Sequence, residues 1–305
     1  MIKVLRDILK PDYDAHELLV AHARSRAQLW RLLAGVSLVI TAQWFLVSLI
    51  WTTLFQLLSD DAYRALYYDF DELLLPQSAL VMLYSFAPVW LSVVFVSVLL
   101  HNRGLASLTG PMDLLASQAI RAARWLIGLN ALGLALVMMT PGTPVAGLAL
   151  GRWLSFLIPA LIGIAIQIGA EELMFRGYLQ QQLAARFRHP VIWMLIPSVL
   201  FGVLHYQPAV FAENAWLIVA WATLFGLLAA DLTARAGTLG PAMALHFVTN
   251  TIALLLVAPQ GPLSGLALFQ HGFSSADVAV VRAYLPVDLA LMICSWLAVR
   301  ISLRR

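Results

Sequence analysis

The sequence predicts an all-α polytopic membrane protein with about eight transmembrane helices. Hydrophobic residues make up 61% of its 305 residues and charged residues only 11%, whereas soluble globular domains carry about 25% charged residues. A bilayer-spanning helix needs about 20 apolar residues, and runs of this kind recur along the whole chain. The charged residues that remain gather mostly between these runs.

The expected spans follow from the stretches that lack charge. The first run starts about 30 residues into the chain and is too long for the apolar region of a cleavable signal peptide, so we expect a signal anchor. The third run contains Arg124 and Asn130, and the fifth is short, so these two are the weakest. The eight runs are 32–58, 77–100, 122–140, 153–176, 191–206, 215–232, 239–258 and 285–303. Residues 1–30 are predicted to form a cytosolic or interfacial segment, and residues 31–305 one eight-span membrane domain.

The distribution of charge predicts the orientation. Six basic residues precede the first span, and the loop after it holds five acids and only one arginine, Arg64. By the positive-inside rule both termini lie in the cytosol. The net charge of +3 is spread along the chain rather than clustered, which argues against a nucleic-acid partner. Arginine outnumbers lysine 17 to 2, a bias that favours a bacterium, so the expected location is the bacterial inner membrane.

Two adjacent glutamates end the apolar run WLSFLIPALIGIAIQI. A carboxylate inside a span is costly, and ionisable groups there are functional candidates by default. On a helix Glu172 and Arg176 are four residues apart and share a face, while Glu171 points about 100° away. We therefore expect Glu172 and Arg176 to form a supporting ion pair, and Glu171 to remain available as a general base. The alternative is that both glutamates only mark the cytosolic end of the span.

His205 ends the next apolar run. A single histidine there is more often a structural hydrogen-bonding group than a catalyst. However, Glu171 precedes Arg188 by 17 residues and His205 follows it by 17. If the turn between the two spans lies near Arg188, an antiparallel hairpin places Glu171 and His205 at the same height.

His246 and Asn250 lie four residues apart in PAMALHFVTNTIALLLV and therefore share a helix face. A polar residue within a span often joins two helices by a hydrogen bond. Two polar residues on one face, together with the glutamates and His205, indicate instead an intramembrane catalytic cavity.

Other chemistries are excluded by spacing or by count. His16 and His22 flank Glu17 in an arrangement similar to a zincin motif, but the second histidine follows the first at position i+6 instead of i+4. Cys294 is the only cysteine, so neither an intramolecular disulfide nor a cysteine metal cluster can form. Nucleophile-elbow, Walker and dinucleotide-binding motifs do not occur.

The three motifs EExxxR, FxxxH and HxxxN resemble those of the CAAX-protease and bacteriocin-processing (CPBP) family of intramembrane proteases, which includes proteins similar to type 2 CAAX prenyl proteases. Here they are Glu171-Glu172 with Arg176, Phe201 with His205, and His246 with Asn250. Each motif is weak alone, but three in the family's order, each on its own span of an eight-span protein, are specific. The resemblance covers a protease-like core of about residues 150–255.

The resemblance implies proteolysis within the membrane. It assigns Glu171 as the base that activates water, His205 as its water-positioning partner, and His246 with Asn250 as the donors to the oxyanion. We expect no cofactor; if zinc is bound, Glu171, His205 and His246 are its candidate ligands. The expected partners are the lipid bilayer and a membrane-associated protein or peptide substrate, whether prenylated or not. Oligomeric state cannot be predicted.

Two other functions use the same residues. In a transporter or channel, buried Glu, His and Asn side chains would line an ion path, although the sequence shows no inverted repeat. In a catalytically idle membrane scaffold they would only support the fold. Loss of peptide cleavage in a Glu171→Gln variant distinguishes a protease from both.

Overall fold

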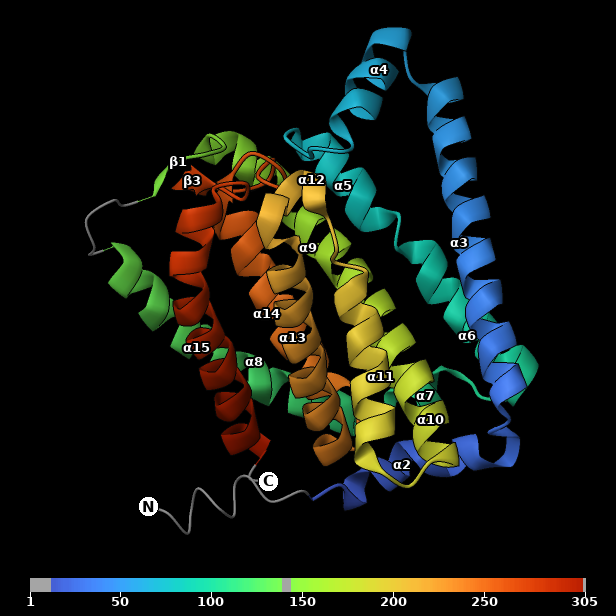
Figure 1. The fold of residues 1–305 in the computed structure, drawn as a ribbon. Helices are drawn as coiled ribbons and strands as arrows, with labels where there is room; N and C mark the ends of the chain where they lie inside the picture. Colours follow the sequence, from blue (N-terminus) through green and yellow to red (C-terminus); the bar gives the residue numbers. More distant parts are fainter. Residues whose placement is uncertain (1–11, 139–143, 304–305) are drawn as a thin grey trace.

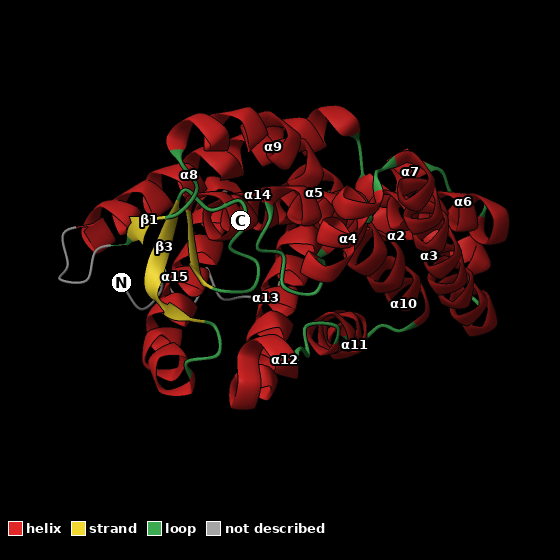
Figure 2. Ribbon diagram, turned by 90° about the horizontal axis from the view of Figure 1, so that it is seen from above, coloured by secondary structure: helices red, strands yellow, loops and turns green. Residues whose placement is uncertain are grey.

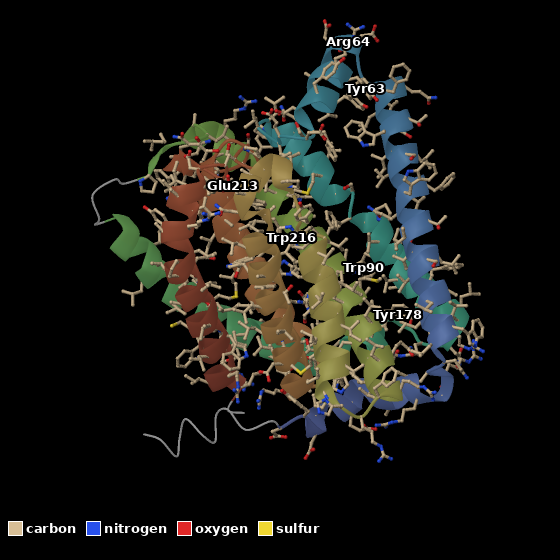
Figure 3. All side chains as sticks on the ribbon, in the orientation of Figure 1. Tyr63, Arg64, Trp90, Tyr178, Glu213 and Trp216 are labelled. Carbon is tan, nitrogen blue, oxygen red and sulfur yellow. The ribbon has the colours of Figure 1, made fainter. Side chains whose placement is uncertain are left out.

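The structure is a computed structural model that describes residues 12–138 and 144–303. Its helices run between two ends of one bundle (Figure 1). One end carries α2, α7 and α10, and we call it the α10 end. The other carries α4, α12 and the strands, and we call it the sheet end. Figure 3 shows Tyr63, Arg64 and Glu213 toward the sheet end and Tyr178 toward the α10 end.

The elements follow one another with short connections. They are η1 (Asp14–His16), α2 (Glu17–Val20), η2 (Ala21–Arg26), α3 (Leu29–Leu57), α4 (Asp60–Asp69), α5 (Pro76–Tyr84), α6 (Ala87–His101), α7 (Leu105–Thr109), α8 (Met112–Met138), β1 (Val145–Ala146), α9 (Leu150–Glu172), η3 (Leu173–Leu179), α10 (Gln180–Arg186), α11 (Pro190–Val203), α12 (Pro208–Phe211), η4 (Ala212–Asn214), α13 (Ala215–Ala236), α14 (Gly240–Thr251), η5 (Ile252–Leu256), β2 (Val257–Gln260), β3 (Phe269–Ser274) and α15 (Val278–Leu303).

The helices confirm an all-α polytopic integral membrane protein. Among the described residues, five stretches are long and apolar enough to cross a membrane, and two shorter apolar helices accompany them. The five are Leu29–Leu57, Pro76–His101, Leu150–Arg186, Pro208–Ala236 and Val278–Leu303, and the shorter two are Pro190–Val203 and Gly240–Leu256. Residues 122–138 of the third predicted run lie in α8, which also carries Asp113 and Arg121, and the last two residues of the run lie outside the described part of the chain. The number of eight spans therefore stays a prediction.

A three-stranded sheet lies at the sheet end and was not predicted from the sequence (Figure 2). Strand β3 is central: β1 pairs with it antiparallel and β2 parallel. The indole Nε1 of Trp153 donates a hydrogen bond to the carbonyl of Leu255 across 2.8 Å. The sheet and this bond fix the start of α9 next to the end of η5.

Helices α11 and α13 pack very closely because two glycines leave room. A Cβ on Gly202 would lie 2.1 Å from Oγ1 of Thr223, and a Cβ on Gly226 would lie 2.9 Å from Cβ of Ser198. Small residues allow helix backbones to approach in this way. This close packing brings the end of α11 beside the middle of α13.

Residues 13–26 pack against the α10 end of the bundle. Leu19 and Ala23 are fully buried, and the ring of His16 lies 4.8 Å from the ring of Trp193. At the start of the segment, the hydroxyl of Tyr13 donates to Asp231 across 3.0 Å. The segment thus covers this end of the bundle. Its cytosolic or interfacial location stays a prediction.

Candidate functional site

Glu172 and Arg176 form the ion pair that their spacing predicts. Nη1 of Arg176 lies 3.0 Å from Oε1 of Glu172, and both side chains are buried. Arg176 also donates to the carbonyl of Gly226 across 3.3 Å and stacks its guanidinium over the ring of Phe201. These contacts compensate the desolvation of the arginine, so the pair fixes the end of α9 to α11 and α13.

His246 lies between the two glutamates. Its Nδ1 is 2.8 Å from Oε1 of Glu172, and its Nε2 is 3.5 Å from Oε2 of Glu171. A carboxylate that accepts a hydrogen bond from one ring nitrogen fixes the orientation and tautomer of a histidine. Glu172 therefore holds His246 so that its second nitrogen faces Glu171.

The two glutamates differ in their access to solvent, as the helical geometry predicts. The side chain of Glu172 is 0% exposed, whereas that of Glu171 is 14% exposed. Glu172 is engaged by both Arg176 and His246. Glu171 has only the longer contact to His246. The buried Oε2 of Glu171, like that of Glu172, lacks a hydrogen-bond partner in the described part of the chain. Glu171 is thus the less buried and less engaged of the two carboxylates.

Asn250 contacts a residue that the sequence analysis missed. Its Nδ2 donates to Oε1 of Gln167 across 2.9 Å, and Gln167 is buried. Gln167 precedes Glu171 by four residues and shares its helix face. This spacing could have identified Gln167 from the sequence, because it extends the polar face of α9 by one turn toward the sheet end.

His205 is placed near the other residues but is not in described contact with Glu171. Its Nδ1 lies 2.8 Å from the carbonyl of Phe201, and its ring is 4.6 Å from the Phe201 ring. The same phenylalanine ring lies 6.0 Å from that of His246. Phe201 therefore connects the two histidines by ring contacts. The predicted partnership of His205 with Glu171 stays a prediction.

Aromatic rings surround His246. Phe225 lies 4.9 Å from it, measured between ring centroids, and Phe225 and Phe201 are both buried. On α6, the indole of Trp90 lies beside the backbone of Gly169, where an added Cβ would be 3.6 Å from it; Figure 3 shows Trp90 between the two ends of the bundle. The polar groups of the site are thus set into an apolar wall, where electrostatic interactions are stronger than in water.

The candidate zinc ligands do not assemble into a site. Within residues 12–138 and 144–303, no group of three or more His, Cys, Asp and Glu side chains is arranged to hold a metal ion. Glu171 and His246 face each other, but His205 turns one nitrogen to its own helix. The structure also contains a cavity of about 440 Å³ lined by Arg121, Trp125, Ile301 and Ser302, none of which belongs to the three motifs. The intramembrane catalytic cavity stays a prediction.

Comparison with known families agrees with the motifs. Residues 152–252 match the family model described as type II CAAX prenyl endopeptidase Rce1-like. This stretch is similar to that family, and we call it the Rce1-like segment. It contains all three motifs, and the resemblance predicted from the sequence is confirmed over its length.

One curated relative is similar to part of the chain. It is the uncharacterized protein YyaK of Bacillus subtilis (strain 168), which is 30% identical over 115 residues. The matching region is 37% of this chain and 38% of the relative, so the chain spans well under half of that protein. No solved structure matches. The function of the Rce1-like segment therefore has to be argued from its own residues.

Proposed function

We propose that the protein is an intramembrane endopeptidase that hydrolyses a peptide bond of a membrane-associated protein or peptide. One observation carries the proposal: a solvent-accessible glutamate faces a histidine that a second, buried glutamate holds in place. The match of the same residues to an endopeptidase family supports it. In a transporter, one carboxylate would not need to orient a histidine so that it faces a second carboxylate.

In the proposed reaction, Glu171 acts as general base. It takes a proton from a water molecule while the water oxygen attacks the carbonyl carbon of the substrate, and the carbonyl oxygen becomes an oxyanion. Collapse of this intermediate expels the amine, which takes the proton from Glu171. General bases of this kind contribute about 100- to 10,000-fold to the rate.

Donors for the oxyanion come from α14 in this mechanism. Asn250 uses one amide N–H for Gln167, which leaves the second available for the substrate oxygen. Nδ1 of His246 is directed to Glu172, so Nε2 provides the other donor in the form of His246 that carries a proton on both ring nitrogens. Removing one such donor typically costs about 100- to 1000-fold in rate. His205 is the proposed water-positioning group.

The test uses variants that separate the base from a control carboxylate. Glu213 is exposed, and its ion pair with Arg282 lies at the sheet end, outside the motifs. We expect Glu171→Gln to abolish the appearance of new peptide termini in membranes of producing cells, measured by quantitative terminal proteomics. Glu213→Gln should give the wild-type pattern. Equal patterns for wild type and Glu171→Gln would refute the protease and favour the transporter or the idle scaffold.

A further inference from the structure

We propose that the cavity between α8 and α15 binds a phosphate ester, and in particular the headgroup of an anionic lipid. Its walls come from Arg121 and Trp125 of α8 and from Ile301 and Ser302 of α15, and its volume is about 440 Å³. None of these residues takes part in the proposed peptidase reaction. The cavity is therefore a second site, with a ligand of its own.

Two hydrogen-bond donors of α8 line the cavity without a protein acceptor. Arg121 and Trp125 are four residues apart and share a helix face. In the described part of the chain, neither the guanidinium of Arg121 nor the indole N–H of Trp125 forms a hydrogen bond or an ion pair. By contrast, the indole of Trp296 on the neighbouring α15 donates to Asp231 across 3.0 Å. The cavity thus offers a full positive charge and a second donor to an anionic oxygen.

The surroundings of the cavity carry an excess of positive charge. Arg124 follows Arg121 on α8, and Arg300 directly precedes the two lining residues of α15. Arg300 is buried, and none of its guanidinium nitrogens has a hydrogen-bond partner in the described part of the chain. Asp231, the acid whose charge acts on Arg300, already accepts hydrogen bonds from three other side chains. No acidic residue lines the cavity itself. The local field therefore favours an anion.

The remaining walls favour a phosphate that carries an apolar group and a hydroxyl. The side chains of Trp125 and Ile301 are both 50% exposed and supply apolar surface. The hydroxyl of Ser302 donates to the carbonyl of Val299 across 2.6 Å, so toward a ligand its oxygen acts as an acceptor. An ester of phosphate with glycerol, as in phosphatidylglycerol, presents an anionic oxygen to Arg121 and a free hydroxyl to Ser302.

The cavity lies where the apolar run of α15 ends. This helix carries no charge in residues 289–299, and Arg300 follows directly. On α8, Leu115 packs against the start of α14, where a Cβ on Gly240 would lie 2.3 Å from the carbonyl oxygen of Leu115. The start of α14 contacts the end of α7. These contacts place the cavity at the α10 end of the bundle, where Figure 1 shows α15 ending.

Under the predicted orientation, the α10 end faces the cytosol. The cytoplasmic leaflet carries anionic lipids, and basic pockets between transmembrane helices on this side bind lipid headgroups. Tryptophan is also enriched at the level of the headgroups, as Trp125 would be here. The position of the cavity and the chemistry of its walls therefore agree. A lipid bound in this way would connect α8 to α15 through its phosphate.

Native mass spectrometry of the purified full chain tests the site. The wild type, Arg121→Gln and Arg124→Gln are each measured with phosphatidylglycerol, phosphatidylcholine or glycerol phosphate at equal concentrations. Arg124→Gln is the matched control, because Arg124 is exposed on the same helix, as Arg121 is, but does not line the cavity. Neither arginine forms an ion pair in the described part of the chain, so both variants should fold.

We expect the wild type and Arg124→Gln to retain one phosphatidylglycerol in preference to phosphatidylcholine. Arg121→Gln should bind it about 10-fold more weakly, the effect of one lost charge-assisted hydrogen bond. Equal binding of the two lipids by the wild type, or binding by Arg121→Gln as tight as by Arg124→Gln, would overturn the site. If glycerol phosphate binds as tightly as the lipid, the phosphate site stands and its ligand is a soluble ester. Because Glu171 is unchanged in these proteins, the result does not depend on the proposed peptidase activity.

Discussion

The amide of Asn250 donates a hydrogen bond across 2.9 Å to Oε1 of Gln167, a residue 83 positions earlier in the chain. This bond joins α14 to α9 one helical turn before Glu171. It also fixes the rotation of the Asn250 side-chain amide, so that the second N–H of Nδ2 points in a defined direction. Gln167 is thus a positioning residue for the proposed oxyanion donor.

We expect Gln167→Leu to lower kcat about 10- to 100-fold, the range typical of lost positioning partners, while KM changes little. Gln167→Glu keeps an accepting oxygen of the same reach and should lose less than Gln167→Leu. Steady-state kinetics on a peptide taken from a cleavage site found by terminal proteomics measures both constants. Equal losses in the two variants would show that the hydrogen bond does not position Asn250.

Glu172 should matter for stability as well as for rate. Glu172→Gln leaves the buried Arg176 without its charge partner, and breaking a buried pair in this way costs about 3–5 kcal/mol. Thermal unfolding in detergent should therefore show a clear loss of stability. Glu17→Gln is the matched control, because it breaks the exposed pair with Arg24, which is worth at most about 1 kcal/mol. A Glu172→Gln protein as stable as this control would contradict the role of the ion pair.

Acid should loosen the segment of residues 13–26. Burial lowers the pKa of His16 to about 4, from an ordinary value of 6.5, and the nearby Glu17 opposes this effect only in part. The docked segment therefore favours neutral His16, and the released segment takes up a proton between pH 6.5 and 4. Docking should weaken as the pH falls through this window, by up to about 3 kcal/mol.

Hydrogen exchange, corrected for the intrinsic effect of pH, measures this release. Protection factors of residues 13–26 should fall between pH 7.5 and 5 in the wild type. In His16→Gln, which cannot take up the proton, they should change little over the same range. A similar fall in both proteins would assign the effect to another group.

Metal removal should change the proposed activity little. The mechanism uses Glu171 itself as the base, and Asn250 is a poor zinc ligand but a good hydrogen-bond donor. After dialysis of the purified protein against a strong chelator, cleavage should remain within about twofold, since the general-base contribution is unaffected. Stoichiometric zinc by mass spectrometry, with activity lost on chelation and restored by zinc, would recast Glu171, His205 and His246 as ligands.

The sequence predicts those parts of the site that depend on local spacing. The pairing of Glu172 with Arg176 and the separate direction of Glu171 follow from helix geometry, and both are present. The contact of His246 with both glutamates could not be predicted, because it depends on how α14 packs against α9. The π-helical turn η3 after Glu172 was also hidden, since its seven residues read as ordinary helix.

The fold was predictable wherever a long apolar run decides the element. The five stretches that are long and apolar enough to cross a membrane lie within or around runs of this kind. The sheet was missed because its strands are short and lie in segments rich in glycine and proline, where β-propensity is weak. The docking of residues 13–26 was missed for a different reason. Its buried side chains alternate with charged ones, a pattern that fits a membrane surface as well as a protein surface.

The pairing of β1 with β3 has a consequence for the evolution of the chain. Strand β1 precedes the Rce1-like segment and β3 follows it after the rest of η5 and β2, and their residues Val145 and Gln270 are direct partners. The stretch from β1 to β3, which contains this segment, therefore begins and ends at one place, as do domains that tolerate insertion or circular permutation. A segment whose ends lie side by side can be inherited, exchanged or recombined as one unit. The helices before and after it can then diverge when the segment stands in a different protein.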